Sequence, residues 1–307
     1  MDNDQVIQWL LEGDVSIQYQ VYRDLLGAKK PELRERIASE GWGARLLQAR
    51  HENGHWGRGF YQPKWISSHY SLLDLRNLGF PSGHPQINES IAIILRDRKS
   101  EDGGINPAVT IAQSDVCING MFLNYACYFK TAETGLHSIV DFVISQQLPD
   151  GGFNCNYNRQ GAVHSSLHST ISILEGIQEY VVNGYEYHRT ELERIAVAAR
   201  EFILQHRLYL SDRTGEVIDK RFLMLSYPSR WFYDILRALD YFWSAKVAYD
   251  SRMQPALDVL KKKRRADGRW PVQAKHPGQV HFDMEQTGGP SRWNTLRALR
   301  VLKHFEQ

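Results

Sequence analysis

Apolar residues recur at helical spacing along most of this chain. Sets with members three or four residues apart include Val6, Trp9 and Leu10; Leu72, Leu75 and Leu78; Ile91, Ile94 and Leu95; Ile139, Phe142 and Val143; and Leu236, Leu239 and Phe242. Residues at this spacing share one face of an α-helix. The apolar–polar alternation of β-strands is nearly absent, and clusters of Gly and Pro separate the helical stretches. The pattern predicts an all-α protein.

The helical stretches repeat. Five segments with related apolar patterns align with one another, at residues 69–78, 117–126, 168–177, 233–242 and 293–302. Each follows a loop that contains Gly or Pro, and most of these loops follow another, more polar helical stretch. The predicted unit is an outer helix, a Gly-rich loop and an inner helix, repeated about every 50 to 60 residues. Residues 1–30 add a helical pair.

The loops carry a resemblance that predicts how these hairpins are arranged. Gln48, Gly54 and Trp56, then Gln147, Gly151 and Phe153, and then Gly268 and Trp270 without the Gln resemble the Gln...Gly-x-Trp/Phe repeat of the terpenoid cyclases and protein prenyltransferases. The resemblance implies an α/α toroid, an α6/α6-like barrel of about five to six hairpins whose inner helices line a central cavity. Residues 1–307 would form one such domain.

The alignment also predicts which side chains meet at one end of that cavity. His69, Cys117, His168, Tyr233 and Trp293 open the inner helices. Within a helix, residues i and i+2 point in different directions, but the backbone at an N-cap is not yet helical. Asp115 and Cys117 can therefore converge on one ion.

Asp115, Cys117 and His168 form a candidate zinc site. Zinc in catalytic sites takes three protein ligands from thiolate, imidazole and carboxylate groups and keeps one position open. Protein prenyltransferases hold zinc with an Asp-x-Cys at one inner helix start and a His at a later one, and this chain resembles them in register. His69 is predicted as a fourth ligand or a proton carrier. The alternative is structural: an N-cap for Asp115, a buried thiol for Cys117 and a hydrogen-bonding histidine.

One activity of the resembling family is not expected. Type II terpene cyclases carry Asp-x-Asp-Asp at this helix start, and the middle carboxyl protonates the substrate. This chain has Cys117 and Ile118 after Asp115, and neither replaces a strong carboxylic acid. A Lewis-acid or thiolate-activating role for a metal is expected instead.

The motif Pro-Ser-Arg-Trp occurs twice, at residues 228–231 and 290–293. Arg230 and Arg292 are predicted to bind an anionic substrate group near helix N-termini. The alternative is that they pair with Asp234, Asp283 or Glu285. The residues predicted as an apolar, substrate-binding wall are Trp65, Tyr70, Trp231 and Trp293.

His281 and Glu285 precede the last inner helix and are candidate general bases. Together with Tyr233 and Arg230 they also suit an alternative function, a polysaccharide lyase or hydrolase with an α/α barrel. No matched pair of carboxylates is evident, which counts against glycoside hydrolysis. A ligand-binding toroid without catalysis is the third hypothesis.

Composition narrows the class of partner. Among 307 residues, 37 Lys and Arg against 35 Asp and Glu give a net charge of +2, so bulk charge predicts no nucleic-acid binding. No secretion signal or membrane span is apparent, and three cysteines do not predict a disulfide framework. We therefore expect a cytoplasmic protein with an apolar or anionic small-molecule substrate. No protein partner can be predicted.

Overall fold

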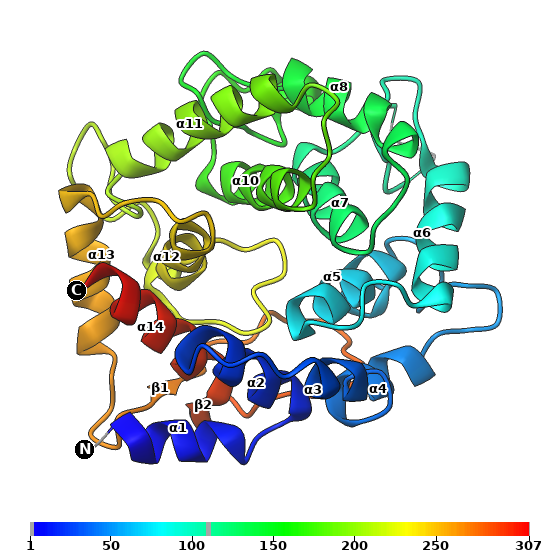
Figure 1. The fold of residues 1–307 in the computed structure, drawn as a ribbon. Helices are drawn as coiled ribbons and strands as arrows, with labels where there is room; N and C mark the ends of the chain where they lie inside the picture. The colour runs from blue at the N-terminus through cyan, green and yellow to red at the C-terminus, as the bar shows by residue number, and fades with distance from the viewer. Residues whose placement is uncertain (1–2, 109–111, 307) are drawn as a thin grey trace. The chain divides into compact units, whose positions relative to one another are not determined.

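A computed structural model describes residues 3–108 and 112–306 of the chain. The regular secondary structure of this part consists almost entirely of helices (Figure 1). Its α-helices are α1 (Asn3–Leu11), α2 (Val15–Gln20), α3 (Pro31–Arg36), α4 (Gly41–Gln48), α5 (Ser68–Leu78), α6 (Pro85–Arg98), α7 (Val116–Tyr128), α8 (His137–Ser145), α9 (Tyr157–Gln160), α10 (Leu167–Val182), α11 (Arg189–Gln205), α12 (Ile235–Ser244), α13 (Gln254–Lys262) and α14 (Arg292–Phe305). A π-helical turn, η1 (Val21–Leu25), extends α2, and two-residue strands β1 (Trp270–Pro271) and β2 (Pro290–Ser291) pair antiparallel. The predicted all-α pattern is confirmed.

The residues group into two compact units by their contacts. The terminal unit contains Met1–Ala49, Asn77–Pro81 and Gln205–Gln307, and the central unit contains Arg50–Arg76 and Ser82–Leu204. Both units are discontinuous in sequence, because the chain leaves the terminal unit and returns to it. The prediction of one domain over residues 1–307 stays a prediction.

The predicted inner helices begin within two residues of the expected positions. They are α5, α7, α10, α12 and α14. His69, Cys117, His168 and Trp293 are each the second residue of their helix, so these four positions are structurally equivalent. Tyr233 instead precedes Asp234, which is the N-cap of α12. The repeat alignment is therefore shifted only at the fourth repeat.

One hydrogen bond recurs between the loops and the inner helices. In four of the repeats, the backbone N–H of the aromatic residue of the Gly-x-aromatic signature, or of its apolar counterpart, donates to a polar side chain in the first turn of that repeat's inner helix. The pairs are Trp56 to Ser68 Oγ at 3.1 Å, Ile105 to Asn119 Oδ1 at 2.7 Å, Phe153 to Thr170 Oγ1 at 3.0 Å and Trp270 to Thr295 Oγ1 at 2.9 Å. The shared bond fixes how each loop meets its helix and places the loop residues that follow near the helix start.

Helices α7 and α10 of the central unit pack with their backbones in close contact (Figure 1). A Cβ atom on Gly120 would lie 2.6 Å from the Ser172 carbonyl oxygen, and one on Gly176 would lie 2.5 Å from the Gly120 carbonyl oxygen. Only glycine permits this approach, because any other residue would overlap the facing backbone. The two helix starts are consequently held at a fixed separation.

A buried charge cluster joins distant segments within the terminal unit. Arg300 of α14 donates to both carboxylate oxygens of Asp240 in α12, at 2.6 Å each, and to Asp24 in η1 at 2.7 Å. Arg297 donates to Asp240 at 3.1 Å. Burial raises the pKa of Asp240, but the charges of Arg300 and Arg297 outweigh this effect and lower it. The cluster ties η1, near the start of the chain, to α12 and α14.

Candidate functional site

Asp115 begins the candidate site in the central unit. It is the N-cap of α7, with extended backbone angles (φ −92°, ψ 125°), and its Oδ1 accepts a hydrogen bond from the Ile118 N–H at 3.2 Å. The extended backbone turns the carboxylate toward the first turn of the helix, as expected from the sequence. The capping role and the convergence of Asp115 with Cys117 therefore occur together.

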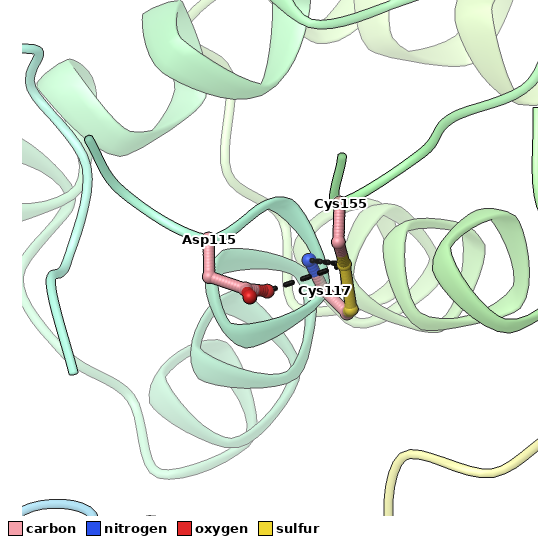
Figure 2. A group of neighbouring side chains, drawn as sticks. All are labelled: Asp115, Cys117 and Cys155. Carbon is pink, nitrogen blue, oxygen red and sulfur yellow. Dashed lines mark hydrogen bonds between the residues drawn. A yellow bond between two sulfur atoms is a disulfide. The ribbon is translucent and has the colours of Figure 1, made fainter. Parts of the chain in front are cut away.

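Cys155, from the loop before α9, completes a group with Asp115 and Cys117 (Figure 2). The carboxylate oxygen and the two sulfur atoms all lie within 4.8 Å of one another. Cys155 Sγ lies 3.2 Å from Asp115 Oδ1 and 3.3 Å from the Cys117 backbone nitrogen. The two cysteines are joined by a disulfide. The sequence analysis, which predicted no disulfide framework, did not anticipate this single bond.

Ser169, in the first turn of α10, holds the loop that carries Cys155. Its Oγ accepts a hydrogen bond from the Cys155 backbone N–H at 3.0 Å and lies 3.1 Å from Cys155 Sγ. The same oxygen lies 3.8 Å from Cys117 Sγ. Ser169 is buried. Two residues earlier in the loop, the Phe153 N–H bond to Thr170 anchors the chain, so helix α10 positions Cys155 through backbone contacts.

His168 is not a member of this group. It occupies the predicted second position of α10, next to Ser169, but its ring is not among the ligand atoms that converge within 4.8 Å. Cys155 takes the third place that the sequence analysis gave to His168. The motif spacing could not reveal this, because Cys155 lies in a loop and matches no inner-helix position.

His69 is buried within an aromatic cage. Its Nδ1 lies 3.3 Å from the Tyr125 hydroxyl, and the rings of Phe60, Tyr61 and Tyr70 lie within 5.6 Å of its own ring centroid. Burial, and to a lesser extent the charge of Lys64, lower the pKa of His69 to about 3. Its imidazole is neutral at ordinary pH. The roles predicted for it, fourth ligand or proton carrier, stay predictions.

Lys64 was not identified from the sequence. The pKa of Lys64 is lowered, because burial disfavours the ammonium group more than the negative charge of Asp115 stabilises it. The charge of Asp115 therefore acts on Lys64. Its Nζ lies 5.8 Å from the ring centre of Tyr61 and 5.1 Å from that of Trp65. Trp65 and Tyr70 are buried and pack edge to face at 4.8 Å. Trp65 also lies near Lys64, and Tyr70 packs on Tyr61 at 5.7 Å. The substrate-binding role predicted for Trp65 and Tyr70 stays a prediction.

The remaining predicted residues belong to the terminal unit, where several are engaged in packing. The buried Tyr233 hydroxyl donates to the Leu208 carbonyl at 2.6 Å, and burial raises its pKa. Arg292 donates to the Trp9 carbonyl at 3.1 Å and places its guanidinium 4.5 Å from the centre of the Trp9 ring. The catalytic role predicted for Tyr233 and the substrate-binding role predicted for Arg292 stay predictions. Arg230 is also buried and has a left-handed backbone, with φ of 57°.

Glu285 accepts hydrogen bonds at the N-terminus of α14. The donors are the Ser291 hydroxyl and the Trp293 backbone N–H, the latter at 3.1 Å. Burial raises the pKa of Glu285, and these hydrogen bonds and the charge of Arg292 only partly offset the rise. Trp293 stacks on Tyr227 at 4.8 Å, and Trp231 stacks on Phe232 at 3.9 Å. His281 is half-buried, and its predicted role as a base stays a prediction.

No protein-family model and no curated protein matches this sequence. Among solved structures, a polysaccharide lyase is similar over 94% of this chain and 86% of its own, with 12% identity and a TM-score of 0.53. A glycosyl hydrolase family 88 protein from Bacteroides vulgatus covers 96% of this chain and 97% of its own, with 12% identity and a TM-score of 0.49. A type II terpene cyclase from Scytonema, in complex with merosterolic acid A, is similar over 85% of this chain and 94% of its own, with 12% identity and a TM-score of 0.33.

The likeness to the lyase shows the fold and no more, because the sequences share so few residues. The predicted fold class, an all-α protein of the α/α-toroid type, is confirmed. The narrower resemblance to prenyltransferases and terpenoid cyclases is not shown by these comparisons. In the part of the chain that the structure describes, no helix has both the length and the apolar character needed to cross a bilayer.

Proposed function

We propose that this chain is a zinc-dependent enzyme of the α/α-barrel class, with the ion held by Asp115, Cys117 and Cys155 when both cysteines are reduced. One observation carries the proposal. A helix start and a separate loop bring a carboxylate oxygen and two sulfur atoms within 4.8 Å of one another. Isolated acidic groups are common on protein surfaces, but two sulfurs and a carboxylate are a donor set that zinc uses.

The donor chemistry favours zinc over the hard divalent cations. Thiolate sulfur suits zinc, whereas Mg²⁺ and Ca²⁺ prefer oxygen ligands. Two sulfurs bound to one tetrahedral zinc at about 2.3 Å lie about 3.8 Å apart, so the disulfide must open before both can bind the ion. Three protein ligands leave one position open, as catalytic zinc sites do. A bound zinc ion would supply Lewis-acid chemistry or activate a substrate thiol.

The neighbouring side chains support an apolar, isoprenoid-like substrate with an anionic group. In this proposal the Lys64 ammonium, whose pKa is influenced by the charge of Asp115, binds the anion, and the half-buried ring of Tyr61 contacts the apolar part. Lys64 replaces Arg292 in this role, since Arg292 is bound to Trp9 in the terminal unit. The neutral His69 packs against Tyr61, with ring centres 5.6 Å apart, and therefore adds no positive charge next to the apolar part of the substrate.

Metal analysis of protein purified under a phosphine reductant tests the proposal. We expect about one zinc per chain, lost in Cys117→Ser and in Cys155→Ser. Cys127→Ala is the matched control, because Cys127 is buried and outside the group, and it should keep its zinc. Zinc that survives both serine substitutions, or that is absent from the reduced wild-type protein, would refute the metal centre.

Two substrate experiments distinguish the zinc-dependent enzyme from the alternative, a polysaccharide lyase or hydrolase. A prenyl diphosphate should raise the melting temperature of the wild-type protein, and less so that of Lys64→Met. Depolymerisation of an acidic polysaccharide that persists in Cys117→Ser would instead favour the lyase or hydrolase hypothesis.

A further inference from the structure

The two sulfur atoms of the candidate site have two uses that exclude each other. Sulfurs joined in the Cys117–Cys155 disulfide lack the thiolate charge that binds zinc. The disulfide and the zinc site use the same two sulfur atoms. The remaining cysteine, Cys127, is buried at the far end of α7. The oxidation state of one pair therefore determines whether the site has one ligand or three.

We propose that Cys117 and Cys155 form a redox gate on the metal site, opened by small thiols and closed by low-molecular-weight disulfides. This inference rests on the proposed zinc site. It adds that oxidation expels the ion and stops the metal-dependent activity, and that reduction restores both.

Cys155 is the sulfur that an external thiol attacks. Cys117 lies in the first turn of α7 with only 9% of its surface exposed, while Cys155 lies in a loop and is only partly buried. Figure 2 shows Cys155 approaching α7 from outside the helix. An external thiolate that bonds to Cys155 Sγ breaks the disulfide and releases Cys117 as a thiolate. A second thiolate then displaces Cys155 and leaves as the small-molecule disulfide.

Closing the gate is the reverse exchange. A cysteine thiolate attacks oxidised glutathione, a low-molecular-weight disulfide, and displaces one glutathione thiolate. The second cysteine thiolate attacks the resulting mixed disulfide and displaces the other. Two protein thiols are oxidised to one disulfide, one glutathione disulfide is reduced to two thiols, and the two protons pass to the released glutathione.

The surrounding contacts make the gate reversible without refolding. The Cys155 backbone is held by its hydrogen bond to Ser169, and Phe153 is held by Thr170, so neither anchor depends on the disulfide. Cys117 is fixed by the glycine contact between α7 and α10 at Gly120. When the disulfide opens, the two sulfurs therefore remain close enough to bind one ion.

The test uses the full-length protein in two redox states. One sample is treated with a phosphine reductant and the other with excess oxidised glutathione. Both are incubated with zinc and freed of unbound metal by gel filtration. We expect about one zinc per chain in the reduced sample, background zinc in the oxidised one, and recovery after reduction of the oxidised sample. Non-reducing peptide mass spectrometry should find the Cys117–Cys155 link only in the oxidised sample.

The control variants distinguish failure of the redox gate from failure of the zinc site itself. Cys127→Ala should switch as the wild type does. Asp115→Asn should still form the disulfide but bind zinc weakly in both states. A reduced, zinc-binding protein that oxidised glutathione cannot link overturns the gate alone. Equal zinc in the linked and reduced forms overturns the metal centre as well, because disulfide sulfurs lack the thiolate charge that binds zinc. No zinc in the reduced wild type overturns the metal centre and the gate with it.

Discussion

Asp115 has two roles that different substitutions separate. It caps α7 through its contact with the Ile118 N–H, and it contributes the only carboxylate of the sulfur–carboxylate group. Asn caps helices about as well as Asp, so we expect Asp115→Asn to change the free energy of unfolding by less than about 0.5 kcal/mol. Zinc affinity should fall at least about tenfold, because an amide oxygen is a poorer ligand than a carboxylate.

Asp115→Ala is the matched comparison. It removes both the ligand and the cap, so urea denaturation should show a loss of about 1 kcal/mol that Asp115→Asn does not show. A zinc titration that gives wild-type affinity for Asp115→Asn would exclude the carboxylate as a ligand.

His69 should make the protein less stable in mild acid. Its pKa is lowered by burial to about 3, against an ordinary value of 6.5. Between these two pH values the unfolded chain binds a proton that the folded protein does not, so stability falls as pH decreases through the window and is unaffected above it. One such group contributes a slope of up to about 1.4 kcal/mol per pH unit.

His69→Phe isolates this effect, because Phe fills the aromatic cage without a titrating nitrogen. Urea denaturation from pH 4 to 8 should give a shallower loss of stability in acid for the variant than for the wild type. Parallel curves would mean that His69 titrates in the folded protein as it does in the unfolded chain.

Single residues show where the sequence was informative about the site and where it was not. The convergence of Asp115 with Cys117 could be predicted, because both lie at one helix start and local backbone geometry determines their positions. Cys155 could not be predicted, because its place depends on a loop 38 residues further along the chain. Arg292 was expected to bind substrate, but its contact with Trp9 involves a residue 283 positions away that no motif identifies.

At the scale of elements, glycines set the distance between α7 and α10. Gly120→Ala would place a methyl group 2.6 Å from the Ser172 carbonyl, so the helices must separate. Although alanine favours helices more than glycine does, we expect a net loss of about 1 to 3 kcal/mol from overpacking. Because α7 and α10 carry the residues that position the sulfurs, zinc binding should weaken as well.

Gly83→Ala is a suitable control for this substitution, since a Cβ atom there meets nothing within 4 Å. Its free energy of unfolding should stay within about 0.5 kcal/mol of the wild-type value. If thermal and urea denaturation show Gly120→Ala to be as stable as Gly83→Ala, the close backbone contact is wrong.

The helices themselves could be predicted well from the sequence. Apolar periodicity depends only on which face of each helix is buried, and the inner helices begin where the repeat alignment expected. The Gly-x-aromatic loops indicated the repeats, and the structure gives the physical reason: the N–H of the aromatic residue bonds to a side chain in the first turn of the inner helix. The Ile105 loop belongs to this set although its aromatic residue is missing, because Asn119 accepts the same bond.

At the scale of the whole molecule, the terminal unit is built from both ends of the chain. Arg300 bonds to Asp24, which lies 276 residues earlier, and to Asp240, and neither partner could be found by periodicity. Replacing Arg300 with Met would remove one cation from each of two buried carboxylates, and would leave Asp240 with Arg297 and Asp24 with Arg23. Breaking a buried pair typically costs about 3 to 5 kcal/mol when the remaining charge has no partner, so we expect a smaller loss here.

The expected damage is confined to one unit, and hydrogen exchange can show this. In Arg300→Met, backbone amides of α2, η1, α12 and α14 should exchange faster, while those of α7 and α10 should keep their protection, because no residue of the cluster lies in the central unit. Adding Asp24→Asn to the same chain should recover part of the lost stability, since an amide is less costly to bury than a carboxylate that has lost its buried cation. Equal acceleration in α7 and α10 would show instead that the two units unfold together, and the charge cluster would then stabilise the entire chain.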